Sequence, residues 1–126
     1  MRYFLILLVA VMLGPAGTAF ALDTSDFKAK TSRNLVNLCS ASPEHEDYQA
    51  ARGFCLGYLD AVHDYHRVIS SGDLDNPVSC PGGPVSRQEL SDVFLAWAKA
   101  NEEMLDTESP IQGVMRASSA RWPCRQ

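Results

Sequence analysis

Four cysteines within about 100 residues set the framework of this chain. They are Cys39, Cys55, Cys80 and Cys124, and all of them follow an N-terminal export signal. An even number of cysteines in a short exported chain is typical of a disulfide framework, because thiols are oxidised outside the cytoplasm. The spacings of 16, 25 and 44 residues lack the close cysteine pairs of a zinc site. We therefore expect two structural disulfides, which four cysteines can form in three ways, and no free nucleophilic thiol.

The first 21 residues have the pattern of a secretory signal peptide. Arg2 supplies a positive charge, residues 3–13 are an almost unbroken apolar run, and residues 19–21 read Ala-Phe-Ala, a small-residue cleavage signal. The run is too short to span a bilayer, and no later stretch approaches the roughly 20 apolar residues of a membrane helix. We expect a signal peptide over 1–21, then one domain over 22–126 with no membrane span.

The charge of the exported part limits its partners. Without Arg2, 10 basic residues face 15 acidic ones, so the net charge is near −5. This charge argues against nucleic acid and anionic membranes as partners and favours a basic partner.

Apolar spacing and capping residues predict an all-α, four-helix, disulfide-stapled domain. Residues 22–30 are polar and aperiodic, so we expect a loose lead-in there. The helices are expected from Thr31 or Ser32 for about ten residues, from 44–47 to about 70, from 87 to about 106, and from 110 to the final Trp-Pro-Cys at 122–124. No alternating strand pattern occurs.

The same spacing predicts which side chains face the core. Ser86 and Glu89 form a capping box, which predicts that the third helix starts at Arg87. Ser109 and Pro110 are a typical start for the fourth. The expected core residues are Leu35, Val36, Leu38 and Cys39; Ala51, Phe54, Tyr58, Ala61, Tyr65 and Val68; Leu90, Val93, Phe94, Trp97, Met104 and Leu105; and Ile111, Val114, Met115 and Ser118.

The helix positions also predict the disulfide pairing. Cys39 ends the first expected helix and Cys55 lies on the second, so a bridge between them would staple two antiparallel helices into a hairpin. The remaining pair, Cys80 with Cys124, would tie the long loop to the C-terminal tail. We predict these two bridges.

A polar cluster on the second helix offers a possible metal site. Asp60, His63, Asp64 and His66 lie within two helical turns, so carboxylates and imidazoles are neighbours. A third ligand from a distant element is missing from the pattern, and a solvated polar face or a partner contact explains the cluster as well. We expect no metal and no cofactor.

The residues do not form a recognisable catalytic motif. The sequence has no serine in a nucleophile elbow, no free cysteine paired with a histidine and no glycine-rich phosphate loop after a strand. We therefore predict a protein that is not an enzyme.

Two acidic segments are candidate binding surfaces. Residues 71–84 are rich in turn residues and too irregular for a helix, and Asp73, Leu74, Asp75 and Asn76 place an apolar residue among polar ones at the tip. We predict that these four residues contact a partner, although an acidic turn of this kind also forms without any binding role. Acidic residues also gather at the end of the third helix, where pairing with Arg116 or Arg121 would offset them; they are Glu102, Glu103, Asp106 and Glu108.

The combined pattern resembles the Rap/Tai family of immunity proteins. It consists of a cysteine closing the first helix, the segment CLGYLDAV at 55–62 followed by Asp64, then Cys80, Pro-Val-Ser at 84–86, and the terminal Trp-Pro-Cys at 122–124. The resemblance covers about 32–124. It implies a helical, disulfide-stapled periplasmic protein that protects a bacterium from peptidoglycan amidases delivered by type VI secretion, acting as a dimer that blocks the active-site cleft of the effector.

The resemblance leaves alternatives for function and for the binding face. A periplasmic stress chaperone or adaptor protein without a toxin partner would share the size, the helices and the disulfides. A metal-binding protein using His63 and His66 is a third possibility. An inhibitor could also bind through the second helix, with Tyr58, Asp64 and His66, or through a dimer face.

Overall fold

A computed structural model describes residues 22–71 and 77–125 of the chain. The predicted signal peptide lies outside these residues. Helices and no strands occur in the described part, which confirms the predicted all-α class. None of these helices is long and apolar enough to cross a membrane. The elements are η1 (Thr24–Lys28), α1 (Ser32–Cys39), α2 (Tyr48–Ile69), α3 (Arg87–Ala100), η3 (Glu102–Met104) and α4 (Pro110–Arg121).

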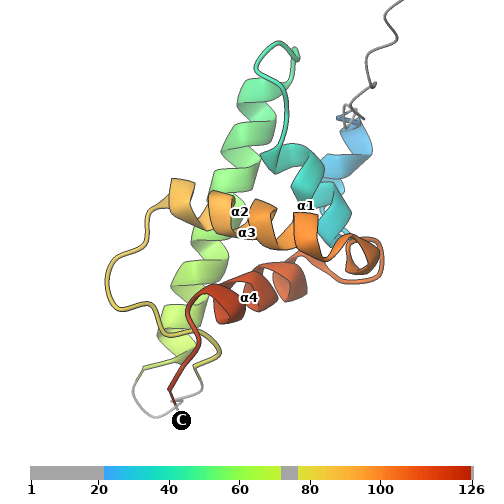
Figure 1. The fold of residues 1–126 in the computed structure, drawn as a ribbon. Helices are drawn as coiled ribbons and strands as arrows, with labels where there is room; N and C mark the ends of the chain where they lie inside the picture. The colour runs from blue at the N-terminus through green and yellow to red at the C-terminus, as the bar shows by residue number, and fades with distance from the viewer. Residues whose placement is uncertain (1–21, 72–76, 126) are drawn as a thin grey trace, which may run out of the picture.

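The long helix α2 is the support on which the other helices pack. Helices α3 and α4 lie side by side and cross α2, while α1 packs against all three (Figure 1). The core between them is almost entirely aliphatic, with one large aromatic ring, so burial of apolar surface is the main source of stability. Its buried members are Leu35, Val36, Leu38, Ala51, Cys55, Leu59, Val62, Leu90, Phe94, Ala98, Leu105, Val114 and Ala117.

Both predicted disulfides are confirmed. Cys39 is bonded to Cys55 and joins the end of α1 to α2. Cys80 is bonded to Cys124 and joins the segment after α2 to the C-terminal tail. The backbone N–H of Cys80 also donates to the carbonyl of Trp122 at 2.7 Å, so the tail is held by two links.

The N-terminal segment is ordered, so the predicted loose lead-in is wrong. Asp26 is only 3% exposed, and its carboxylate accepts hydrogen bonds from the side-chain amides of Asn34 and Asn37 at 2.9 and 3.1 Å. Phe27 packs edge-on against Phe54, with ring centroids 5.9 Å apart. These tertiary contacts lie outside any local periodicity, which explains why a sequence pattern misses them.

The buried face of α2 differs from the predicted one. Tyr65 and Val68 are each 62% exposed, and Ala61 is exposed as well. The helix instead buries the stripe Ala51, Cys55, Leu59, Val62 and His66, which is rotated by about one residue toward the C-terminus. Cys55 is bonded to Cys39 of α1 and lies in the middle of this stripe, so the bridge and the observed rotation of the helix agree.

Helix α3 begins as predicted and ends earlier. Ser86 accepts a hydrogen bond from the Glu89 N–H at 3.1 Å, and the helix starts at Arg87. The prediction that it continues to about residue 106 is wrong, because Asn101 leaves the helical conformation and its side chain caps the Trp97 carbonyl at 2.8 Å. Met104 is consequently carried by η3.

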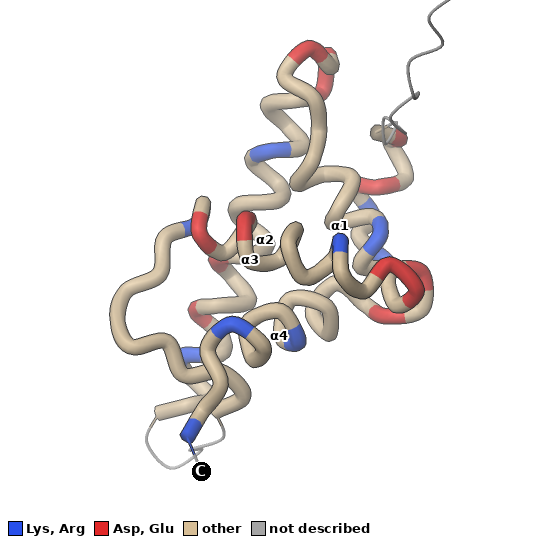
Figure 2. Tube along the Cα trace, in the orientation of Figure 1, with Lys and Arg blue, Asp and Glu red and all other residues tan. Residues whose placement is uncertain are grey.

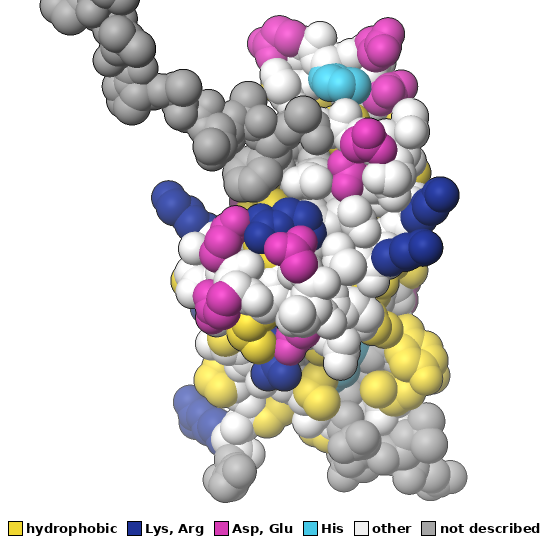
Figure 3. All heavy atoms as spheres, turned by 90° about the vertical axis from the view of Figure 1, so that its right-hand side faces the viewer, with side chains coloured by type: hydrophobic (Ala, Val, Ile, Leu, Met, Phe, Trp, Pro, Cys, Tyr) yellow, Lys and Arg dark blue, Asp and Glu magenta, His cyan; other side chains and the backbone are white. Residues whose placement is uncertain are grey.

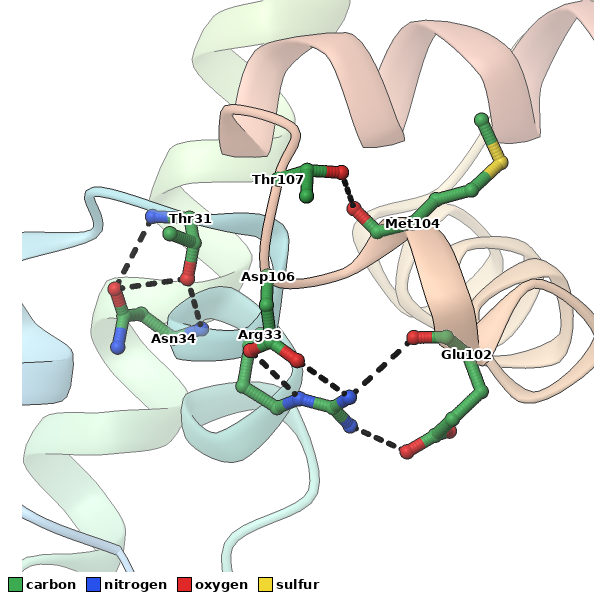
Figure 4. Close-up of polar contacts among 7 residues, drawn as sticks. All are labelled: Thr31, Arg33, Asn34, Glu102, Met104, Asp106 and Thr107. Carbon is green, nitrogen blue, oxygen red and sulfur yellow. Dashed lines mark hydrogen bonds and ion pairs between the residues drawn. The ribbon is translucent and has the colours of Figure 1, made fainter.

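Arg33 of α1 offsets the acidic turn after α3. Its guanidinium forms ion pairs with Glu102 and with Asp106, as Figure 4 shows. The predicted pairing of this cluster with Arg116 or Arg121 is confirmed for Arg116, which contacts Glu108 at 2.8 Å. Figure 2 shows acidic positions of the turn after α3 close to a basic position at the start of α1, a neighbourhood that sequence spacing did not indicate.

Helix α4 starts at Pro110 with Ser109 as its cap, as predicted. Val114 and Ser118 are buried, but the prediction that Ile111 faces the core is wrong, because its side chain is 42% exposed. Gly113 lies on the inner face instead. A Cβ at this position would overlap Ser32 Oγ and lie 3.3 Å from the Trp97 ring.

Replacing Gly113 with alanine is expected to lower the free energy of unfolding by about 1–2 kcal/mol. Ser32 is fully buried and donates to the Ser109 carbonyl at 3.0 Å, so it cannot move away without losing this hydrogen bond. The cost of this overpacking outweighs the better helix propensity of alanine. Urea unfolding measures the change. Gly57→Ala is the matched control: nothing lies within 4 Å of the added Cβ, and stability should rise by about 0.5–1 kcal/mol. An equal gain at Gly113 would contradict the close approach of α1 and α4.

Candidate functional site

A cleft of about 800 Å³ lies between the C-terminal half of α2 and the segment 77–85. Helix α2 contributes Asp60, His63, Asp64 and Arg67 to one wall. The opposite wall is a stretch of proline and glycine that cannot extend the helix, so the chain turns back along α2. Its residues are Pro77, Ser79, Cys80, Pro81, Gly82, Gly83, Pro84 and Val85.

The charges on the helical wall of the cleft are mostly paired. Asp60 contacts Arg87 at 2.8 Å, and Asp64 lies 3.7 Å from Arg67. Both arginines are well exposed, so these pairs contribute little to stability and can exchange partners readily. The cleft therefore offers both signs of charge to a binding partner.

His66 lies at the base of this cleft. Its side chain is 5% exposed, and its Nε2 accepts a hydrogen bond from the Val78 backbone N–H at 3.1 Å. Ser70 Oγ lies 3.0 Å from the same nitrogen. Burial, reinforced by the charge of nearby His63, lowers the pKa of His66 below its ordinary value of 6.5. The ring is therefore a neutral structural acceptor that joins α2 to the segment 77–80.

Two large apolar side chains lie exposed on α2 beside the cleft. Tyr65 and Val68 are three residues apart on the helix, so they project from the same side of it. They share this stretch with Asp64 and Arg67 of the cleft wall. Figure 3 shows hydrophobic side chains gathered on the lower part of one face of the molecule and acidic ones above them. An apolar pair with charged neighbours is a typical protein-binding surface.

The structure separates the residues that sequence reasoning grouped together. The predicted contact residues Asp73, Leu74, Asp75 and Asn76 lie outside the described residues. The interpretation of Asp60, His63, Asp64 and His66 as a solvated polar face is wrong for His66, which is buried. Over 22–71 and 77–125, no group of three histidine, cysteine or acidic side chains is placed to hold a metal ion.

The three residues of the alternative interface on α2, Tyr58, Asp64 and His66, have different surroundings. Tyr58 is half-buried and stacks on Phe54 with centroids 6.2 Å apart, and burial raises the pKa of its phenol. Asp64 is exposed, whereas His66 faces inward. Asp64 and His66 therefore both line the cleft, as wall and base, whereas Tyr58 does not line it.

Tyr65 and Val68 were missed as surface residues because the periodicity assigned them to the core. Two stripes on α2 satisfy helical spacing almost equally well, since Phe54 and Tyr58 border both. The predicted Cys39–Cys55 bridge would have decided between them: a cysteine bonded to a neighbouring helix must face that helix. Requiring Cys55 at the centre of the buried stripe leaves Tyr65 and Val68 exposed.

The helices, the two bridges and the cleft define a small disulfide-stapled all-α domain. The profile of the Rap1a immunity proteins matches residues 31–124. The chain therefore belongs to the family of Rap1a immunity proteins, and membership implies a role in immunity to a type VI effector. Comparisons with curated proteins and with solved structures find no match.

Proposed function

We propose that this protein is a periplasmic immunity protein that binds and inhibits a secreted peptidoglycan amidase by blocking its active-site cleft. The family match over residues 31–124 is the observation that carries the proposal. The signal-peptide pattern over 1–21 and the two disulfides are consistent with export to an oxidising compartment. Such an inhibitor acts by binding and needs no catalytic group or cofactor of its own.

The α2 surface beside the cleft has the properties of an inhibitory contact. Tyr65 presents a large, rigid side chain that loses little conformational entropy on binding, and Val68 extends the apolar area. The backbone beneath them is a helix of 22 residues bonded to α1 by a disulfide, so the surface is held in place before binding. Residues 73–76 remain a proposed second contact, since two carboxylates suit the positive surroundings of a catalytic cysteine in the target.

Replacing Tyr65 and Val68 together with alanine is expected to weaken binding to the amidase by about 2 kcal/mol or more, roughly 30-fold, because the apolar anchor is lost. The test uses a peptidoglycan amidase of the type VI effector class, with affinity measured by calorimetry and inhibition by peptidoglycan hydrolysis. A second variant carries alanine at Asp73, Leu74 and Asp75 and tests the loop separately.

Ile111→Ala is the matched control for the α2 variant. Ile111 is also a large exposed apolar side chain, but it lies on α4 and does not line the cleft, so binding should change less than twofold. Unchanged inhibition by both folded test variants would sink the binding-face assignment. No inhibition by the wild type would reject immunity toward this amidase.

A dimer is part of the proposal, and a groove of about 530 Å³ between α3 and α4 is the surface best suited to it. The groove is mainly apolar, and Asp92 and Arg121 flank it. The apolar residues lining the groove are Val93, Ala96, Trp97, Ala100, Ala117 and Ala120. Light scattering after gel filtration tests the dimer.

The alternative function is that of a stress chaperone or adaptor protein. It predicts that the protein suppresses aggregation of unrelated proteins at low pH.

A further inference from the structure

The side chain of His66 connects the end of α2 to the segment 77–85, which runs back along the helix. His66 Nε2 accepts from the N–H of Val78, twelve residues later, and lies 3.0 Å from Ser70 Oγ in the last turn of the helix. Two residues beyond Val78, Cys80 is fixed to the C-terminal tail by its disulfide. The contact between His66 and Val78 therefore joins the first part of the segment 77–85 directly to α2.

The chemistry of this contact depends on protonation. A backbone N–H can only donate, so Nε2 must be unprotonated and the neutral ring carries its proton on Nδ1. A proton on Nε2 would turn the acceptor into a donor that faces the Val78 N–H, so the bond to Val78 would be lost and only Ser70 Oγ could accept from the ring. The ring is buried, so the charge and the lost hydrogen bond would both be costly.

The surroundings of His66 offer a new charge little compensation. Around the small space beneath the ring, α3 contributes Leu90, α4 contributes Val114, Met115 and Ser118, and the returning segment contributes Ser79, none of which is charged. The charged neighbours lie on α2 itself, toward the cleft. Of these, His63 repels a second positive charge, Asp60 is paired with Arg87, and Asp64 lies near Arg67.

We propose that His66 is an acid-sensitive clasp that holds the segment 77–80 against α2, so that protonation releases this wall of the cleft and weakens partner binding. The effect on the partner rests on the proposed function, whereas the opening of the clasp does not. The direction of the pH effect follows from the linkage between protonation of His66 and folding. Because the pKa of His66 is lower in the folded chain than in the unfolded chain, its contribution to stability is complete above about pH 6.5 and is lost as the pH falls through the folded pKa.

The test of the clasp needs no partner. The hydrogen-exchange protection of the Val78 amide, corrected for the intrinsic rate, is measured by NMR from pH 7.5 to 4.5 on the oxidised domain, residues 22–126. The wild type should lose at least about tenfold protection with the same midpoint as the His66 ring titration. His66→Gln keeps a neutral acceptor and should lose less than twofold. The half-buried His63→Gln is the matched control and should keep the acid response.

Different midpoints for Val78 protection and for His66 titration would overturn the clasp, and this comparison needs only the wild type if the glutamine variant does not fold. Constant Val78 protection across the titration would overturn it equally. An acid response retained in a folded His66→Gln would do the same.

The second measurement is the affinity for the amidase used to test the proposed function, at pH 7.5 and pH 5. The wild type should bind about tenfold more weakly at pH 5, and His66→Gln less than twofold more weakly. Equal pH dependence in both would overturn the link to binding. No wild-type binding at pH 7.5 would reject the proposed function instead, and the exchange measurement would still support or overturn the clasp.

Discussion

Replacing Cys80 and Cys124 together with serine is expected to lower the free energy of unfolding by about 4 kcal/mol. The bridge closes a loop of 44 residues, and the loss reflects the larger conformational freedom of the unfolded chain without it. Urea unfolding of the oxidised variant and the wild type, followed by circular dichroism, measures the difference. For a domain of this size the effect is comparable to a large part of the total stability.

The other bridge provides the matched comparison. Replacing Cys39 and Cys55 with serine opens a loop of only 16 residues, for which chain entropy predicts a loss of about 3 kcal/mol. Cys55 is 2% exposed, so this variant also places a hydroxyl in the core, and part of its loss is a packing effect. A loss below about 1 kcal/mol at Cys80 and Cys124 would contradict the chain-entropy account.

Phe94→Ala is expected to cost about 3–5 kcal/mol of unfolding free energy. Phe94 is 1% exposed and is the largest fully buried side chain in the described residues. It stacks on Trp97 with ring centroids 6.4 Å apart, on the face of α3 that meets the other helices. Removing the ring leaves a cavity that the surrounding helices fill only in part, and the disulfide between α1 and α2 restricts their movement further.

Two controls separate the cavity from other effects. Phe94→Leu keeps most of the volume and should cost roughly a third as much. Val68→Ala removes an exposed apolar group and should change stability by less than about 0.5 kcal/mol. If Phe94→Ala and Phe94→Leu had equal effects, the loss would come from the aromatic contact with Trp97 and the cavity argument would fail.

The parts of the fold that the sequence predicted correctly are those encoded by local chemistry. Ser86 and Ser109 are capping side chains whose hydrogen bonds lie within one turn, so the starts of α3 and α4 could be read directly. The cysteine pairing followed from the order of the helices. The end of α3 depended on one side chain, Asn101, which caps the helix although the apolar pattern continues.

The candidate site was harder to predict because it depends on the rotation of α2. A rotation by one position exchanges His66 with Tyr65 between the core and the surface, and apolar spacing alone does not distinguish the two. The buried ring of His66 accepts a hydrogen bond from the N–H of Val78, a residue outside any helix. Contacts of this kind arise only when the returning segment meets α2 in three dimensions.

The position of the second bridge has a consequence for the order of folding. Any chain that emerges N-terminus first, from a ribosome or through a membrane channel, presents Cys39 and Cys55 early, and their helices can be cross-linked while the rest is still arriving. Cys124 follows Cys80 by 44 residues, with α3 and α4 between them, so the second bridge can form only after both helices have emerged. The bridge between α1 and α2 can therefore form before the segment after α2 is fastened, and a chain without Cys124 lacks that second link.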